Sequence, residues 1–272
     1  MSGTQVHGTA RTAFAAEWLR LRTPRALLWP LFAAVAGALY ALGLSIAAEQ
    51  RVMGGRSGFW VAAAALSGCQ GAGALIAALF AASGLASDTG GGLLRAALTR
   101  PVSRRAWVAG RLGALALGVL LLSLAATAGV LLVAQLRFGF AAATEGELVI
   151  ASGAQLAGQL GLALGLSLLA QAAAVGLGGA LGLALGAGGP AVVAAAVTGV
   201  GLAALSRWPA VERLLPSAWL SAGLDRVAQL ALGLSVPPPS DSALPAALNV
   251  LCWCAASLAL AAGVLERKDI TS

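Results

Sequence analysis

Residues Ser87–Arg111 read SDTGGGLLRAALTRPVSRRAWVAGR and form the longest charged interruption between strongly apolar parts of the chain. One apolar run ends just before this stretch, and another begins directly after it. Near its start, Asp88 or Thr89 can accept hydrogen bonds from the free N–H groups of a helix terminus. The glycines at 90–92 then let the backbone turn sharply. These features predict a turn and a new helix start inside the interruption.

A short amphipathic helix is expected at residues 91–99, directly after this turn. Leu94 and Leu98 are separated by one helical turn, so they share one face of the helix. Pro101 disfavours a helical conformation at Arg100 and therefore ends the element. A helix with an apolar face and a basic end, held between two apolar segments, is suited to contact a partner.

The composition of the chain places it among membrane proteins. Its 272 residues are 59% hydrophobic and 10% charged, with a mean hydropathy of +0.89, whereas a soluble domain carries roughly 25% charged residues. A membrane-spanning helix needs about 20 apolar residues. Five uncharged runs meet this length, namely Ala26–Ala48, Ser57–Ser87, Leu112–Leu136, Leu148–Ser206 and Ser242–Leu265. The sequence therefore predicts an all-α integral membrane protein and excludes a soluble globular fold.

The chain is expected to form a single transmembrane domain, residues 1–272. The predicted spans are residues 26–48, 58–85, 107–133, 155–185, 190–205 and 243–265. The Gly/Pro-rich break at Ala187–Pro190 separates the fourth span from the fifth. The basic segment 11–22 is expected to be a helix in the membrane interface, or equally a simple basic anchor before the first span. Segment 207–241 is expected to form an outer helical hairpin, with one or two short helices that re-enter the membrane or lie on it.

Basic residues are distributed unevenly between the two sides of this topology. With the N-terminus inside, the cytoplasmic side holds Arg11, Arg20, Arg22, Arg25, Arg95, Arg100, Arg104, Arg105, Arg111, Arg267 and Lys268. Acidic residues balance the basic ones on the outer side, so the net charge of +7 lies inside. Arg and Lys in cytoplasmic loops orient membrane proteins and sit well against anionic lipid. The pattern predicts that both termini are cytoplasmic, and it explains the positive charge without nucleic-acid binding.

Glycines recur at helical spacing in the fourth span. Gly178, Gly182 and Gly186 are four residues apart, and Gly161 and Gly165 repeat the interval. Small residues at this spacing let helix backbones approach closely in lipid. The alternative is that glycine is merely tolerated in a chain that contains 36 of them.

The residues that membrane enzymes and ATPases need are missing from the sequence. The only lysine, Lys268, lies in the tail, so no phosphate-binding loop of the ATPase type is present. The predicted spans contain no His, Asp or Glu, which argues against intramembrane proteolysis and proton-coupled transport. Cys69, Cys252 and Cys254 fall in apolar runs without nearby partner ligands, which favours ordinary helix residues over a metal site. No catalytic residue, metal site or cofactor of this chain is therefore expected.

Polar residues are sparse within the predicted spans. Ser67 and Gln70 in the second span and Gln171 in the fourth are candidates for lining a substrate path. The alternative is that these side chains form hydrogen bonds between helices, which contribute about 0.6–2 kcal/mol each.

Several short motifs match a known pattern. They are Asp88, Gly92-Leu93-Leu94, Leu98, Pro101-Val102-Ser103-Arg104, Gly110-Arg111 and the ending Glu266-Arg267-Lys268-Asp269-Ile270. In these motifs and in the placement of its spans and loops, nearly the whole chain resembles the six-span permease subunits of type-two ABC exporters. Leu93 stands where that family usually has Thr, and Arg111 where it usually has Lys.

The resemblance implies an export permease that works as a dimer with a second copy or a paralogue. It implies two separate ABC ATPase subunits that bind ATP and Mg, and a place in the bacterial cytoplasmic membrane. The helix at 91–99 would be a cytoplasmic coupling helix between spans two and three. The residues expected to contact the ATPase are Asp88, Gly92, Leu93, Leu94, Arg95, Leu98, Arg100, Pro101 and Arg104. For the arginines, topology and lipid headgroups are the alternative explanation.

Other functions remain open from the sequence. A membrane anchor or scaffold could recruit a partner without transport, and an intramembrane lipid-modifying enzyme would need buried acid and base residues that are absent. Drugs, peptides, lipids and polysaccharides are all compatible substrates. The outer segment 207–241 is also a candidate surface for an extracytoplasmic partner.

Overall fold

The computed structural model describes residues 10–21, 28–50, 57–91, 103–145, 148–206, 208, 211, 214–216, 218–234 and 243–267. Six helices within these ranges are long and apolar enough to cross a membrane. This confirms the helical membrane fold with six spans. The predicted coupling helix at 91–99 lies almost entirely outside the described residues.

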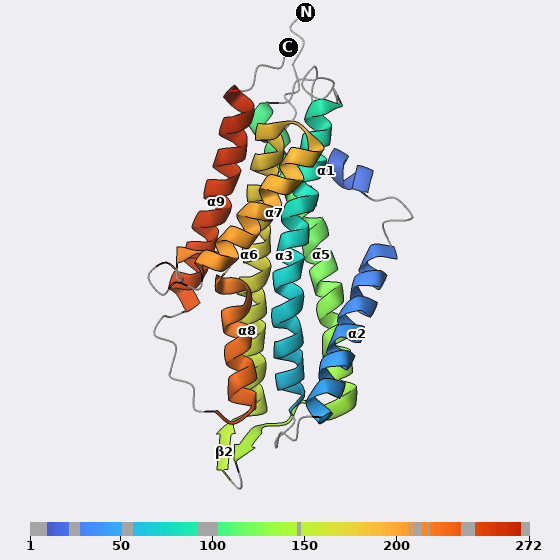
Figure 1. Ribbon diagram of the computed structural model, residues 1–272, viewed down its shortest axis with the longest axis vertical. Helices are drawn as coiled ribbons and strands as arrows, with labels where there is room; N and C mark the ends of the chain where they lie inside the picture. Colours follow the sequence, from blue (N-terminus) through green and yellow to red (C-terminus); the bar gives the residue numbers. More distant parts are fainter. Residues whose placement is uncertain are drawn as a thin grey trace, which may run out of the picture.

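The helices follow the predicted order along the chain (Figure 1). They are α1 (Ala10–Leu21), α2 (Leu28–Gln50), α3 (Gly58–Gly90), α5 (Arg104–Phe138), α6 (Gly153–Leu185), α7 (Gly188–Leu205), α8 (Ala218–Ala231) and α9 (Ala243–Arg267). Serine side chains cap three of the helix starts. Ser103 and Ser152 accept hydrogen bonds from the backbone N–H groups of Ala106 and Gln155 at 3.2 Å, and Ser57 accepts one from Phe59. These caps occupy donors that a helix leaves free at its first turn.

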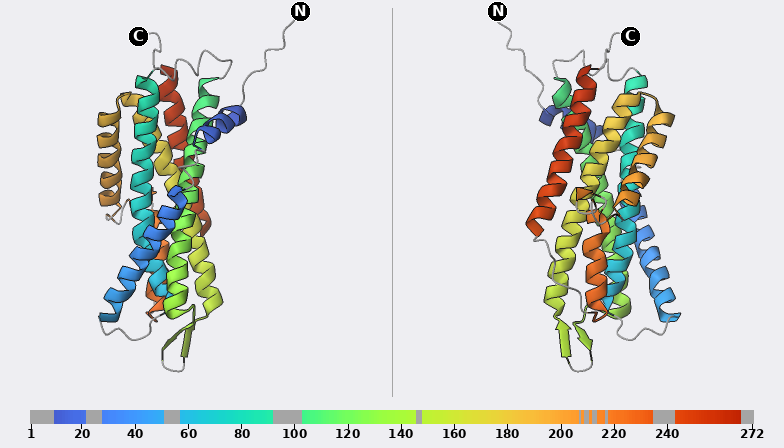
Figure 2. Two further views of the ribbon diagram at one scale, coloured as in Figure 1. Left: turned by 90° about the vertical axis from the view of Figure 1, so that its right-hand side faces the viewer. Right: turned by 60° about the vertical axis from the view of Figure 1, so that its left-hand side comes forward.

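Three long helices form the centre of the bundle. α3 and α6 have 33 residues each and α5 has 35, which makes each about 50 Å long. A hydrocarbon core is about 30 Å thick, so these helices extend past it or tilt within it. α2 packs mainly against α5, and α9 against α6 (Figure 2). The ends of α3 and α9 and the start of α5 lie together at one end of the molecule, the upper end in Figure 1.

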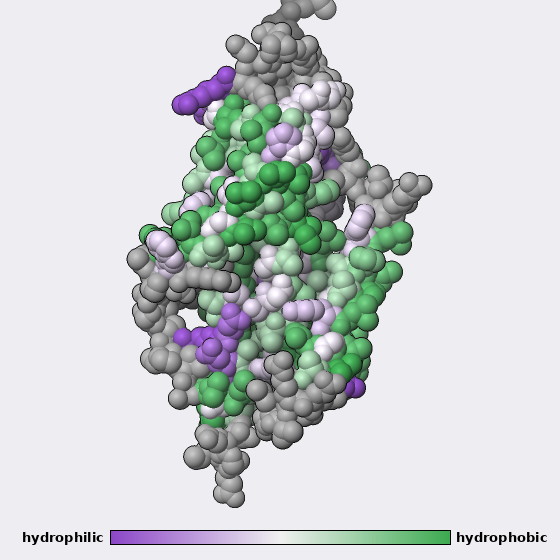
Figure 3. All heavy atoms as spheres, viewed as in Figure 1, coloured by the Kyte–Doolittle hydropathy of each residue, from purple (hydrophilic) through white to green (hydrophobic). Residues whose placement is uncertain are grey.

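The outer surface of the bundle is apolar where the short spans lie. Val193 and Val197 on α7 are 62% and 67% exposed, and Figure 3 shows hydrophobic side chains covering the α7 and α2 regions of this face. Exposed valines of this kind are compatible with contact to lipid acyl chains, as expected for membrane-spanning helices.

Close backbone contact between α3 and α6 depends on two of the predicted glycines. A Cβ atom at Gly178 or Gly182 would lie 2.1 Å or 2.4 Å from the carbonyl oxygen of Ala78 or Ala82 on α3. The tight-packing prediction is therefore confirmed at these two positions. It is wrong for Gly161 and Gly165, since an added Cβ there would meet nothing within 4 Å. The third glycine of the series, Gly186, ends α6 in the left-handed conformation with a φ of 64°.

α8 forms part of the bundle. It packs along α3 and α6 in the half of the molecule farther from the end of α9, while α7 occupies the other half (Figures 1 and 2). Leu224 and Val227 of α8 are each 1% exposed. The predicted re-entrant segment 207–241 therefore contains a helix buried against two spans; its remaining residues are described only in part.

The predicted loop between the third and fourth spans contains a small β-hairpin. Strand β1 (Ala143–Glu145) pairs antiparallel with β2 (Leu148–Ala151). The sequence analysis did not predict this hairpin, because these few residues carry little alternating pattern. It projects from the end of the molecule opposite the end of α9 (Figure 1).

Candidate functional site

The predicted ATPase-contact residues fall into two groups. Gly92, Leu93, Leu94, Arg95, Leu98, Arg100 and Pro101 lie outside the described residues, so their roles remain predictions. Asp88 and Arg104 are described, and they flank that segment on α3 and α5. Both make contacts inside the protein that differ from the sequence-based expectation.

Asp88 belongs to the last turn of α3 and is 1% exposed. Its Oδ2 lies 2.9 Å from Nη2 of Arg111 on α5. The neighbouring Thr89 hydroxyl donates a hydrogen bond to the carbonyl oxygen of Ala86, within the same helix. Within the chain, the Asp88 side chain faces the bundle and binds an arginine there, so an ATPase contact of its carboxylate stays a prediction. Thr89 likewise bonds back into α3.

From the sequence, Arg111 was counted as a cytoplasmic basic residue and as part of the Gly110-Arg111 motif, and Glu17 was not singled out. In the structure, the other terminal nitrogen of Arg111, Nη1, donates a hydrogen bond to Oε2 of Glu17 on α1. Arg111 is 5% exposed and lies on the same buried face of α5 as Trp107 and Leu115. The four-residue spacing of these three positions was the available signal, since it places a charge on an otherwise apolar stripe.

Arg104 stabilises the end of α9. Its guanidinium donates hydrogen bonds to the carbonyl oxygens of Leu265 and Glu266, each at 3.2 Å. The last carbonyl groups of a helix have no partner within the helix and carry partial negative charge, so an arginine binds them favourably. These hydrogen bonds are internal, and the ATPase contact expected of Arg104 stays a prediction. The neighbouring Arg105 pairs with the Glu266 carboxylate, with Nε and Oε1 2.5 Å apart.

Two of the three residues predicted to line a substrate path are instead buried among the helices. Gln70 is 2% exposed and Gln171 is 1% exposed. Gln171 donates a hydrogen bond to Oε1 of Gln70 and accepts one of 2.6 Å from the Ser123 hydroxyl. Gln70 in turn donates to Thr127 at 3.5 Å. This network joins α3, α5 and α6. It agrees with the alternative explanation of these polar residues, which was that they form hydrogen bonds between helices.

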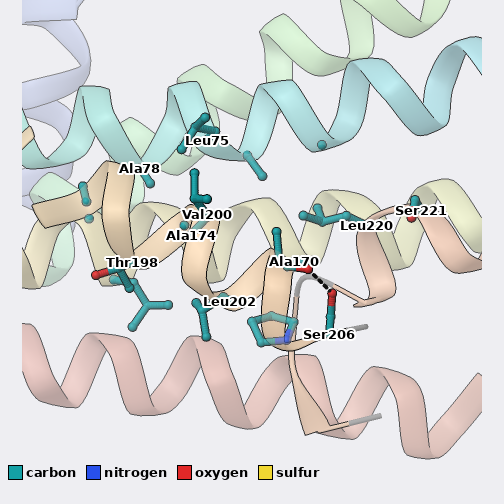
Figure 4. A pocket seen from close by; sticks show the side chains of 18 of the residues that line it. Leu75, Ala78, Ala170, Ala174, Thr198, Val200, Leu202, Ser206, Leu220 and Ser221 are labelled. Atoms are coloured by element: carbon teal, nitrogen blue, oxygen red, sulfur yellow. Dashed lines mark hydrogen bonds between the residues drawn. The ribbon is translucent and has the colours of Figure 1, made fainter. Parts of the chain in front are cut away.

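Ser67, the third predicted residue, lines a cavity of about 540 Å³. The walls come from α3, α6 and α7, from the segment leading into α8 and from the first turn of α8 (Figure 4). Most of the lining is apolar and small, such as Ala78 and Ala174, and none of the described lining residues is charged. Hydroxyl groups of Ser67, Thr198 and Ser221 add a few polar points. The volume lies within the range of small-molecule sites, and the lining suits an uncharged or amphipathic molecule.

Comparison with known proteins identifies the family of the chain. Residues 25–270 match the model of the ABC-2 family transporter proteins. A search of curated proteins finds no match. The family model spans all six apolar helices and the charged contacts at the ends of α3, α5 and α9. The chain therefore belongs to the ABC-2 family of transporter proteins and is a multi-pass permease component of an ABC transporter.

Proposed function

We propose that this chain is the permease of an ATP-driven exporter and that it works as a dimer with a second copy or a paralogue. Two separate ATPase subunits on the cytoplasmic side bind ATP and Mg and drive the cycle. The match of residues 25–270 to the ABC-2 transporter family carries this proposal. The protein resides in the bacterial cytoplasmic membrane as one transmembrane domain, with both termini in the cytoplasm.

The coupling segment 91–99 passes movement of the ATPase to the second and third spans. Leu94 and Leu98 fill an apolar groove on the ATPase, and Arg95 and Arg100 add ionic contacts. The described contacts support this role because both flanks of the segment are attached to the bundle. Asp88 binds α5, and Arg104 binds the end of α9. A force on the segment would therefore reach α3, α5 and α9 directly.

The cavity beside Ser67 is the proposed place for substrate. Many small apolar side chains line it, together with four that carry a hydroxyl group, namely Ser67, Thr198, Ser206 and Ser221. A substrate with a substantial uncharged part fits this lining. The Gln70–Gln171 network lies behind the cavity walls as a structural bridge.

Co-purification is the first test of the proposed function. The tagged chain, expressed with its native operon and extracted gently, is expected to bring an ABC ATPase in equal stoichiometry, identified by mass spectrometry. A preparation that holds no ATPase would refute the permease–ATPase assembly and favour the anchor function.

Substitutions in the coupling segment test how the two subunits interact. Leu94→Asp or Leu98→Asp places a charge on the face expected to enter the groove, where an unpaired buried charge is strongly unfavourable. ATPase recovery with the tagged chain is expected to fall at least about tenfold, because a loss of about 1.4 kcal/mol of binding free energy weakens affinity tenfold. Ala96→Asp, on the opposite face of the predicted helix, is the matched control and should retain binding. Equal recovery with all three variants would exclude the leucine contact.

A further inference from the structure

One arginine bridges three helices near the charged end of the molecule. Nη1 of Arg111 donates a hydrogen bond to Glu17 of α1, and Nη2 lies 2.9 Å from Oδ2 of Asp88 on α3. Arg111 itself belongs to α5. A planar guanidinium presents donors in a fixed fork, so it can hold two carboxylates from different directions at once. We name Glu17, Asp88 and Arg111 the charge cluster.

The charge cluster is buried, unlike the ion pair next to it. The side chains of Arg111, Glu17 and Asp88 are 6%, 14% and 2% exposed. The nearby Arg105 and Glu266 side chains are 76% and 41% exposed. A buried charge is stable only with a partner, whereas an exposed pair contributes little because water screens it. The buried cluster therefore constrains the helices that carry it, and the exposed pair provides a matched comparison.

The packing beside Arg111 brings α1 close to α5. A Cβ at Gly110 would lie 2.7 Å from the Cβ of Ala13, and one at Gly113 would lie 3.4 Å from the ring of Phe14. Glycine at these positions allows α1 to lie directly against α5, where Glu17 reaches Arg111. The helix predicted to lie in the membrane interface is thus docked onto a span (Figure 2).

The charge cluster contains residues from both sides of the segment at 92–102. Asp88 lies three residues before Gly91, the last described residue of the α3 side. Arg111 lies eight residues after Ser103, the first described residue of the α5 side. The cluster thus joins the chain entering the segment to the chain leaving it, and attaches α1 to both.

We propose that Arg111, together with Glu17 and Asp88, is a positioning cluster that makes α1 and the flanks of α3 and α5 move as one unit when the ATPase acts on the permease. The proposal rests on the proposed function, because it needs an ATPase that exerts the force. Neither the family match nor the sequence motifs assign this role to these three residues. Arg111 acts through the two carboxylates, so the change to measure is the coupled movement of α1 and α3.

The variants separate this role from simple folding. Arg111→Met alone removes the shared cation from two buried carboxylates and is expected to fold poorly. The triple variant Glu17→Gln, Asp88→Asn, Arg111→Met removes all three charges at similar volume, which proteins usually tolerate. Arg111→Lys keeps the cation and is the conservative variant. Arg105→Gln removes the exposed pair at the same end and is the control.

Amide hydrogen exchange, measured by mass spectrometry, tests whether the charge cluster holds α1 to α3 and α5. In the isolated chain in lipid nanodiscs, the triple variant is expected to exchange at least about tenfold faster in residues 10–21 and 84–91. Residues of α6 should be unchanged. In the complex, ATP with orthovanadate is expected to change the exchange of both segments in wild type. This response should be lost in α1 of the triple variant and kept with Arg111→Lys and Arg105→Gln.

Failure of the positioning role and failure of the proposed function give different experimental results. If the triple variant exchanges like wild type in the isolated chain, or transmits the vanadate response to α1 unchanged, the positioning role is refuted although the proposed function stands. If the wild-type chain binds no ATPase, the proposed function fails and the transmitted movement fails with it. Exchange in the isolated chain then still decides whether the cluster holds α1 to α3 and α5.

Discussion

At the scale of single residues, burial decides what each polar side chain does. Gln171 and Arg111 both lie inside an apolar bundle, and both are held by partners on other helices. Burying a polar group without a hydrogen-bond partner costs free energy. Each of these residues therefore restricts the positions of the helices that carry its partners. These two buried polar residues therefore link helices to one another.

Gln171→Leu should destabilise the protein measurably. The substitution leaves the Gln70 carbonyl and the Ser123 hydroxyl without their present partner, and such a loss costs about 1–3 kcal/mol. The midpoint of denaturant-induced unfolding in detergent should fall accordingly. Ser67→Ala, at the cavity wall on α3, should leave the midpoint nearly unchanged. If both variants unfold like wild type, the amide network contributes no stability.

At the scale of helices, α3 and α6 form the closest pair of the bundle. Gly178 and Gly182 allow the backbone of α6 to touch the Ala78 and Ala82 turns of α3. In lipid, helices associate through such close packing because the hydrophobic effect does not drive them together. The two helices carry Gln70, Gln171 and most of the cavity lining between them. Their separation therefore sets the geometry of both features.

Gly178→Ala should weaken this pair, whereas Gly165→Ala on the same helix should not. The new Cβ at 178 would meet the Ala78 carbonyl oxygen at 2.1 Å, and overpacking of this kind costs about 1–3 kcal/mol. Position 165 has open space, and replacing a helical glycine by alanine there gains up to about 1 kcal/mol. Unfolding midpoints of the two variants in detergent should therefore shift in opposite directions. A shift of the same sign for both would contradict the close approach of α3 and α6.

At the scale of the whole molecule, the charged contacts gather at one end. The end of α3, the start of α5 and the end of α9 lie together there (Figure 1). The β-hairpin marks the opposite end. Basic residues concentrate on the side predicted to be cytoplasmic, so the three-dimensional arrangement agrees with an even number of spans and one cytoplasmic face.

Reporter fusions should show this orientation in cells. Alkaline phosphatase, which is active only outside the cytoplasm, should be active when fused after Glu145 in the hairpin and inactive when fused after Gly186. A fluorescent protein at the C-terminus should fold and fluoresce. Phosphatase activity at Gly186, with none at Glu145, would invert the orientation and remove the proposed docking side of the ATPase.

Much of the fold could be predicted because its signals are local. Long uncharged runs identify spans wherever they occur, and the glycine–proline break at 187–190 does separate α6 from α7. The hairpin and the packed position of α8 were missed, since neither depends on hydropathy alone. For the predicted site, Asp88 and Arg104 were recognised as important positions, but their contacts with α5 and α9 were not predicted.

The sequence by itself determined that this is a six-span helical membrane protein with a charged segment between its second and third spans. The length of an apolar run, its flanking charges and its turn residues are local features of the sequence. They can therefore be recognised without knowledge of the tertiary structure. Only the tertiary structure decided that Asp88 and Glu17 meet on Arg111, and that Gln70 binds Gln171 while Ser67 lines the cavity. Those pairings depend on how far each helix rotates and where it crosses its neighbours, which is set by packing across the whole bundle.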